Sequence, residues 1–104
     1  MQEIIINRLK QVAHQVLPQN AHIWLYGSQA RGEAHAGSDW DLLILLDKDK
    51  IVQDDFDNIS FPLIETGWSL GIDVSPQMYT KNDWTAHSFF PFQQNVERDK
   101  IVLV

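Results

Sequence analysis

Residues 27–42 read GSQARGEAHAGSDWDL, a turn of small residues followed at short range by two alternating carboxylates. The segment before it, His22–Tyr26, is rich in aromatic and β-branched residues and stops at Gly27, which predicts a strand that ends in a turn. Ser28 is expected to cap a short helix whose first backbone N–H groups are free to face an anion. A glycine at position 27 lets the backbone come close to a ligand and adopt positive φ. The stretch therefore predicts a phosphate-binding turn at Gly27 and Ser28.

The acidic end of the stretch leads into an almost continuous apolar run, Leu42–Leu46. Such a run predicts a central strand that is covered on both faces. Side chains alternate along a strand, so Asp39 and Asp41 should share one face while Trp40 points into the core on the other. Two carboxylates on one face form a candidate site for one or two hard cations.

A third candidate carboxylate, Asp73, lies in residues 69–75. We expect this segment to be a strand with one buried and one polar face, formed respectively by Leu70, Ile72, Val74 and by Gly71, Asp73, Ser75. An isolated aspartate on a polar face is often only solvated, but here two other acids lack a partner. Three neighbouring carboxylates repel one another unless a cation compensates them, and Mg²⁺ commonly bridges carboxylates to substrate phosphates. The pattern predicts two-metal phosphoryl or nucleotidyl transfer.

These motifs carry a family resemblance. Gly27-Ser28, the Ala-Arg-Gly at 30–32 and the Ser-Asp-x-Asp-Leu at 38–42 resemble the signature of the minimal nucleotidyltransferases, in the DNA polymerase β-like superfamily. Residues 71–74 resemble the family's strand with the third acid, residues 89–98 its last helix, and residues 101–104 its closing strand. The resemblance implies an α/β fold, with helices packed against a mixed β-sheet, in a single domain over residues 1–104.

The resemblance also implies an activity, a Mg²⁺-dependent transfer of an NMP, with AMP from ATP as the expected case, to a hydroxyl acceptor. It assigns catalytic, metal-binding roles to Asp39, Asp41 and Asp73, and nucleotide-binding roles to Gly27, Ser28, Arg31 and Ser38. Two Mg²⁺ ions would lie on Asp39 and Asp41, and Asp73 would hold the ion beside the acceptor. Arg31 could neutralise a phosphate or equally pair with Glu33.

Single-domain members of this family often accompany a small helical HEPN-type protein and act as the antitoxin to that RNase toxin. The acceptor would then be a hydroxyl of the toxin. One alternative is a non-catalytic nucleotide-binding module that neutralises its partner by stoichiometric contact. Another is transfer to a small antibiotic, as in the aminoglycoside nucleotidyltransferases, which usually carry an added domain.

Composition limits the choice of partners. The chain has 104 residues, 44% of them hydrophobic, which is enough for one domain with one core. Its 8 basic and 14 acidic residues give a net charge of -6 without a stripe of Lys and Arg, so unaided nucleic-acid binding is not expected. There is no cysteine, which excludes disulfides and thiolate metal sites and is compatible with the cytoplasm, where we expect the protein. No apolar run approaches the roughly 20 residues of a membrane span.

The remaining segments are expected to be structural. Residues 1–17 predict an amphipathic helix ended by Pro18, and residues 51–65 a helical region interrupted near Pro62. Asp54, Asp55 and Asp57 are expected to be solvated, and of the four histidines His35 lies in the candidate active loop. Late in the chain we expect a set of aromatic residues that mostly join the core, with a partner interface as the alternative: Trp68, Trp84, Phe89, Phe90 and Phe92.

Overall fold

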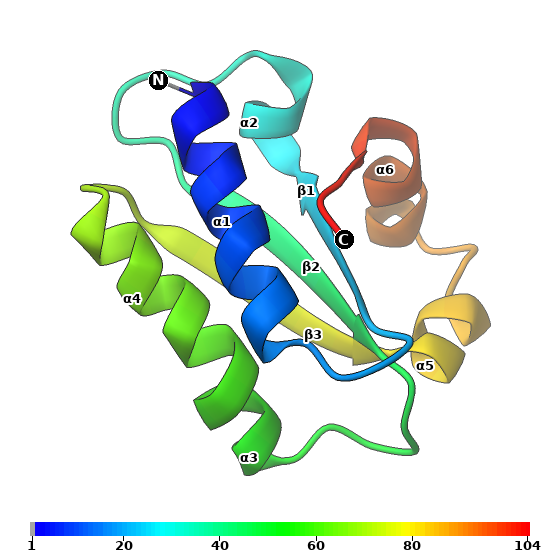
Figure 1. Ribbon diagram of the computed structural model, residues 1–104. Helices are drawn as coiled ribbons and strands as arrows, with labels where there is room; N and C mark the ends of the chain where they lie inside the picture. Colours follow the sequence, from blue (N-terminus) through cyan, green and yellow to red (C-terminus); the bar gives the residue numbers. More distant parts are fainter. Residues whose placement is uncertain (1) are drawn as a thin grey trace.

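A four-stranded mixed sheet, with helices on both faces, forms the centre of the computed structural model, which describes residues 2–104 (Figure 1). The elements in chain order are α1 (Gln2–Val16), β1 (His22–Tyr26), α2 (Gly27–Arg31), β2 (Trp40–Leu46), α3 (Gln53–Asp55), the π-helix η1 (Phe56–Ser60), α4 (Phe61–Ser69), β3 (Val74–Thr80), α5 (Lys81–Ala86), α6 (Pro91–Asp99) and β4 (Ile101–Val102). The strand order is β3-β2-β1-β4. The predicted α/β fold with a mixed sheet is confirmed.

Strand directions bring the candidate motifs to one end of the sheet. β1 pairs antiparallel with β2, and β2 pairs parallel with β3. The C-terminal end of β1 therefore lies beside the N-terminal ends of β2 and β3. In this register Tyr26 is opposite Asp41, and Asp41 is beside Ser75.

The core is built around β2, whose residues Leu42–Leu46 are all at most 5% exposed. On one face the sheet packs against α1 and α4, where Leu9 and Leu63 are fully buried. On the other face Trp84 of α5 and Val96 of α6 complete a second cluster. Each such burial stabilises the fold by about 1.5–3 kcal/mol. As predicted, β2 is covered on both faces, and Trp40 lies in the α1 and α4 core.

The strand predicted over residues 69–75 is wrong in position. Ser69 ends α4, Gly71 turns the chain with φ of 75°, and β3 begins at Val74. Pro76 and the polar residues around it give β3 no recognisable strand pattern in the sequence. The proline is tolerated because β3 is an edge strand. Asp73 therefore lies just before the strand. The predicted burial of Val74 is confirmed.

The predicted interruption near Pro62 is also wrong. Pro62 is the second residue of α4, which directly follows η1. The chain enters α4 through η1, in which the Phe61 N–H donates to the Phe56 carbonyl with π-type spacing. The helical path from Gln53 to Ser69 is therefore continuous.

The predicted terminal elements are confirmed with shifted bounds. The N-terminal helix is observed as α1, while Met1 lies outside the described residues. The last predicted helix and strand are observed as α6 and as the two-residue β4, which pairs with β1. None of the helices in residues 2–104 is long and apolar enough to cross a membrane.

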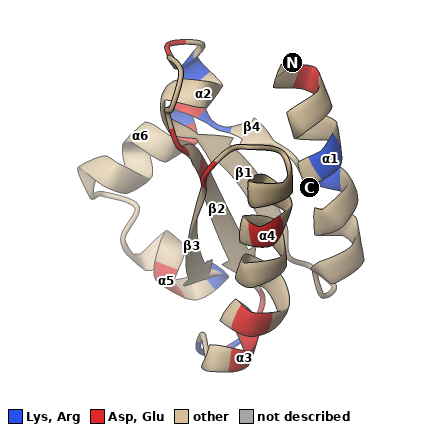
Figure 2. Ribbon diagram, turned by 90° about the vertical axis from the view of Figure 1, so that its left-hand side faces the viewer, with Lys and Arg blue, Asp and Glu red and all other residues tan. Residues whose placement is uncertain are grey.

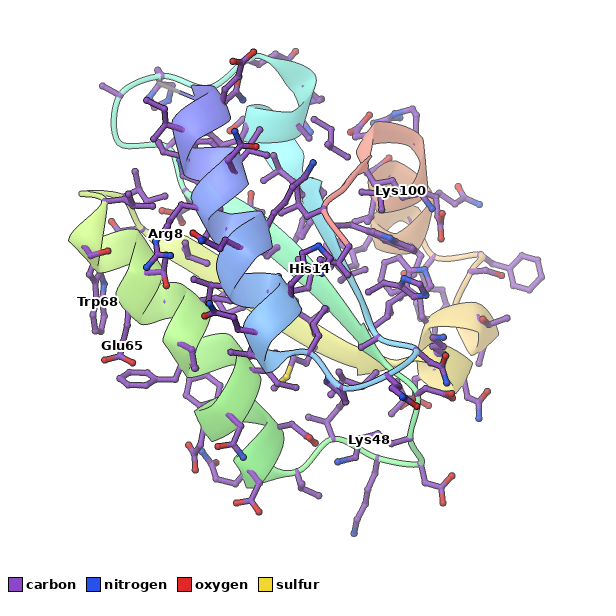
Figure 3. The ribbon with its side chains drawn as sticks, viewed as in Figure 1. Arg8, His14, Lys48, Glu65, Trp68 and Lys100 are labelled. Carbon is purple, nitrogen blue, oxygen red and sulfur yellow. The ribbon has the colours of Figure 1, made fainter. Side chains whose placement is uncertain are left out.

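Most of the late aromatic residues do not join the core, contrary to the first of the two expectations for them. Trp84 is buried, but Trp68, Phe89 and Phe90 are 59%, 83% and 56% exposed, and Phe92 is exposed as well. Trp68 lies on the outer side of α4 (Figure 3). The sequence pattern could not distinguish these surface aromatics from core residues.

Candidate functional site

The site begins where β1 turns into α2. Gly27 has φ of 74°, as its predicted role requires. A Cβ atom at this position would lie 2.3 Å from Oδ2 of Asp41, so the carboxylate would have to move to admit it. The carboxylate of Asp41 thus lies directly against the backbone of the turn. Glycine is required at position 27 both for its backbone angle and for this close approach.

The capping role predicted for Ser28 is wrong. The helix α2 already begins at Gly27, so Tyr26 is its N-cap and Ser28 lies within the first turn. The left-handed conformation of Gly27 has turned the chain before Ser28 is reached. Ser28 instead accepts backbone hydrogen bonds at its carbonyl, from Gly32 and Glu33, which close the short helix.

Asp39 and Asp41 form the acidic pair predicted from alternation. Asp41 is half-buried on β2, and Asp39 is exposed one residue before the strand begins. Burial, and then the negative charge of Asp39, raise the pKa of Asp41, while the positive charge of Arg31 partly opposes them. The two carboxylates therefore repel each other at a partly desolvated position, which favours a bound cation.

Asp73 lies just before β3, next to the start of β2. Its backbone carbonyl accepts a hydrogen bond of 2.9 Å from the Trp40 N–H. Extending the β2–β3 register by one residue places Asp73 beside Asp39. Figure 2 shows acidic positions where the chain enters β2 and β3, and a separate group around α3. Within residues 2–104, however, no three Asp, Glu, His or Cys side chains lie close enough to hold one metal ion.

The donor set of the pair fits magnesium. Mg²⁺ prefers hard oxygen ligands and is usually held by one or two carboxylates together with substrate phosphates and water. Asp39 and Asp41 supply two carboxylates next to the Gly27 turn. A Mg²⁺ ion on this pair would take its remaining ligands from substrate oxygens and water, so it does not require a third protein ligand.

Arg31 forms the ion pair that was one of its two expected roles. Its guanidinium contacts Glu33, and it also lies 3.3 Å from a carboxylate oxygen of Asp99, which links α2 to α6. Ser38 is held in a turn, where its hydroxyl accepts a 3.0 Å hydrogen bond from the His35 N–H. The Gln29 amide donates to the Ser38 carbonyl at 3.3 Å.

Sequence reasoning missed Tyr26. This residue faces Asp41 across the β1–β2 pair. Burial raises the pKa of Tyr26 to about 12, with smaller contributions from Asp41 and Tyr79. Its phenol thus stays protonated at neutral pH and is a hydrogen-bond donor beside the acidic pair. The sequence did offer one indication of its role, since Tyr26 is the last residue of the predicted strand and directly precedes the glycine turn.

A cavity of about 220 Å³ opens beside Asp73. It lies between the loop that follows α2 and the loop from α4 to β3, and it is lined by Gln29, His35, Ala36, Gly37, Ser38, Trp40, Gly71, Ile72 and Asp73. Neither Asp39 nor Asp41 is part of its lining. Its residues come from segments that are far apart in the sequence, so only the folded chain reveals it.

Comparison with known families identifies the class of protein to which this fold belongs. Residues 6–103 match the model of the nucleotidyltransferase domain, and the chain belongs to that family. Comparison with curated proteins gives no match.

Two solved structures share the fold. One is a toxin–antitoxin complex with AMP-PNP, with 21% identity and a TM-score of 0.67 over 95% of this chain and 72% of the other. The second is the tri-AMPylated Shewanella oneidensis HEPN toxin with its MNT antitoxin, with 19% identity and a TM-score of 0.62 over 100% of this chain and 72% of the other. At these identities the likeness establishes the fold.

Proposed function

We propose that this protein transfers AMP from ATP to a hydroxyl group of a protein partner, with Mg²⁺ as cofactor. The observation that carries the proposal is the contact between the Gly27 turn and the Asp41 carboxylate, with Asp39 close enough to raise the pKa of Asp41. The contact supports the proposal because, if the turn binds phosphate and the pair binds a cation, it brings the two together as transfer of a nucleotide requires. Membership of the nucleotidyltransferase domain family supports the same chemistry.

Each residue has a proposed part in the reaction. Gly27 and Ser28 hold the β- and γ-phosphates through the backbone, while Arg31 and Ser38 contribute further polar contacts to the nucleotide. Asp39 and Asp41 would hold Mg²⁺, which when bound supplies charge neutralisation at the attacked phosphorus and lowers the pKa of the acceptor hydroxyl. The acceptor oxygen forms a bond to the α-phosphorus as the bond to the leaving pyrophosphate breaks. Asp73 takes the acceptor proton at a carboxylate oxygen and releases it to solvent.

The proposed partner is a small helical HEPN-type toxin, with this chain as its antitoxin. Both structural neighbours belong to toxin–antitoxin complexes, and in one of them the HEPN toxin carries AMP groups. The acidic composition of this chain also suits a protein acceptor better than free nucleic acid. Modification of a toxin hydroxyl would then block the toxin.

The experiment that tests the proposal is incubation with labelled ATP, Mg²⁺ and a candidate HEPN-type protein, followed by intact mass of both proteins. The wild type should add AMP units to the partner. The double variant Asp39→Ala, Asp41→Ala should lose several orders of magnitude in rate, because it loses the groups that would hold the cation. The matched control is Asp49→Ala with Asp54→Ala, which removes the same charge from two exposed positions away from the site.

The same variants test the alternative function. If the double site variant still protects against the partner as well as the wild type does, and no mass is added, then the chain is a stoichiometric binding module. If the control variant loses transfer as completely as the site variant, the acidic pair is not the catalytic site.

A further inference from the structure

The outer side of α4 carries aromatic residues where a helix on a protein surface usually carries polar ones. The helix buries Leu63 and Gly67 on its inner side, toward the sheet. Phe61, Glu65 and Trp68 follow one another at spacings of four and three residues, which places them together on the opposite side. Phe61 and Trp68 are both exposed, and their rings meet edge to face with centroids 6.1 Å apart. The two rings therefore form one continuous apolar surface.

The π-helix η1 extends this surface toward the start of the helical path. Because the Phe61 N–H donates to the Phe56 carbonyl, Phe56 lies one π-turn before Phe61, near the same side, and it is exposed as well. Figure 3 shows Trp68 and Glu65 on the outer side of α4. We name Phe56, Phe61, Glu65 and Trp68 the α4 patch. Aromatic residues are enriched in protein interfaces, and a row of them differs from the single apolar residues found on most protein surfaces.

The surroundings of the α4 patch are acidic. Residues 51–80 contain aspartate and glutamate but no lysine, arginine or histidine. Within residues 2–104, neither Glu65 nor the exposed Asp57 takes part in an ion pair. Figure 2 shows acidic positions on α3 and α4 and basic positions on α1, where Arg8 donates to Gln11 at 2.8 Å. Uncompensated negative charge therefore borders the exposed aromatic rings.

This combination of rings and charge selects one kind of occupant. A second copy that docked through the same patch would bring Glu65 near its own equivalent, and nucleic acid or anionic lipid would be repelled. A protein surface with Lys and Arg around an apolar centre would instead cover the rings and compensate the carboxylates. Resting on the function proposed above, we infer that the α4 patch docks the protein partner through such a basic, apolar-centred surface.

A partner on the α4 patch would leave the nucleotide site free. α4 packs on the face of the sheet that holds Trp40, whereas Asp41 shares the other face with Leu43 because side chains alternate along β2. α4 also ends at Ser69, just before the turn into β3, so the patch extends toward the end of the sheet that carries the acidic pair. Docking should therefore affect the KM for the partner and leave kcat unchanged.

The first test measures binding of the candidate HEPN-type protein to the whole chain by calorimetry without ATP, so that binding does not depend on transfer. Trp68→Ala should weaken binding at least about tenfold, because tryptophan often carries much of an interface's binding energy. The same variant should raise the KM for the partner by a similar factor. Phe89→Ala is the matched control, since Phe89 is also an exposed aromatic residue but lies between α5 and α6. An unchanged melting temperature rise with Mg²⁺ and ATP would show that Trp68→Ala is folded.

The second test reverses one charge of the patch. At low salt Glu65→Lys should weaken binding more than Asp49→Lys, which makes the same charge change in the loop before α3, outside the patch. The difference should shrink at about 1 M salt, where charges are screened beyond about 3 Å. If the two variants bind equally at low salt, the partner's surface is not basic at this point and the inference is wrong.

The outcomes separate this inference from the function on which it rests. If the wild type adds AMP to the partner but Trp68→Ala binds it as tightly as Phe89→Ala does, the docking surface is refuted and the proposed function stands. If both patch variants weaken binding but the wild type transfers no AMP, the docking surface stands and the proposed transfer fails. If the wild type self-associates in sedimentation experiments and Trp68→Ala abolishes this, the patch binds a second copy and the inference is wrong.

Discussion

Replacing Gly27 by alanine tests whether the close approach of Asp41 to the turn matters. The added Cβ atom would lie 2.3 Å from Oδ2 of Asp41, whereas an ordinary contact needs at least 3.4 Å. The carboxylate must therefore move by roughly 1 Å, and a displacement of that size in a catalytic site costs about 100-fold in rate. We expect Gly27→Ala to fold and to lose about that factor in AMP transfer.

Gly32→Ala is the matched control. Gly32 has φ of 72°, close to that of Gly27, but a Cβ atom there would meet no described atom within 4 Å. Each alanine in this left-handed conformation costs about 1–2 kcal/mol. In a domain of this size each kcal/mol lowers the melting temperature by about 4–8 °C. Both variants should thus be less stable, and only Gly27→Ala should also displace the carboxylate.

The assay combines two measurements on the same proteins, the rise in melting temperature caused by Mg²⁺ and ATP, and the rate of label transfer to the partner. The control should keep both, while Gly27→Ala should lose most of the thermal shift as well as the rate. Equal rates for the two alanine variants would refute the reasoning, because the contact with Asp41 would then have no functional consequence.

Three other changes have defined expectations. Asp41→Asn should abolish transfer yet raise stability at pH 7. Burial and the charge of Asp39 raise the pKa of Asp41 in the folded state above its ordinary value of 3.8, which applies to the unfolded state. The stability of the wild type therefore falls as pH rises from the unfolded-state to the folded-state pKa, and it stays lowered at higher pH. Urea unfolding should therefore show the gain at pH 7 and none below pH 3.8, and equal stability at pH 7 would contradict this. Leu63→Ala should lower the free energy of unfolding by about 2–5 kcal/mol, since Leu63 is fully buried, and a loss near zero in the same assay would be inconsistent with that burial. Arg31→Ala should leave the free energy of unfolding nearly unchanged, because its ion pairs are exposed, but it should reduce the rise in melting temperature caused by Mg²⁺ and ATP. An undiminished rise would contradict the proposed nucleotide contact of Arg31.

The parts of the fold that could be predicted are those marked by a sequence pattern within a single segment. β1 stands between turn residues and has an aromatic and β-branched composition, and its predicted bounds are the observed ones. Asp39 and Asp41 are two residues apart, so strand alternation alone puts them on one face. The sequence could not place β3, because an edge strand with Pro76 at its third position lacks the apolar pattern that marks a buried strand.

The parts of the site that could not be predicted depend on pairing between distant segments. Tyr26 reaches Asp41 only because β1 and β2 pair in that register. The cavity lies between the loop after α2 and the loop before β3, which meet where the Trp40 N–H donates to the Asp73 carbonyl. Phe89 is exposed because it lies in the connection between α5 and α6, which neither hydrophobic cluster includes. Only the packing of the helices on the sheet decides this.

Burial along one face of β2 explains why the carboxylates lie where they do. On this face Asp39 is exposed, Asp41 is half-buried and Leu43 is fully buried. A carboxylate at position 43 would lose nearly all its hydration, whereas one at position 39 alone would be screened by water. Position 41 is the intermediate case, in which a charge is held rigidly by the core yet can still be reached by a cation. The repulsion between Asp39 and Asp41 is then relieved when a cation binds, so the protein should be most stable with Mg²⁺ and nucleotide bound.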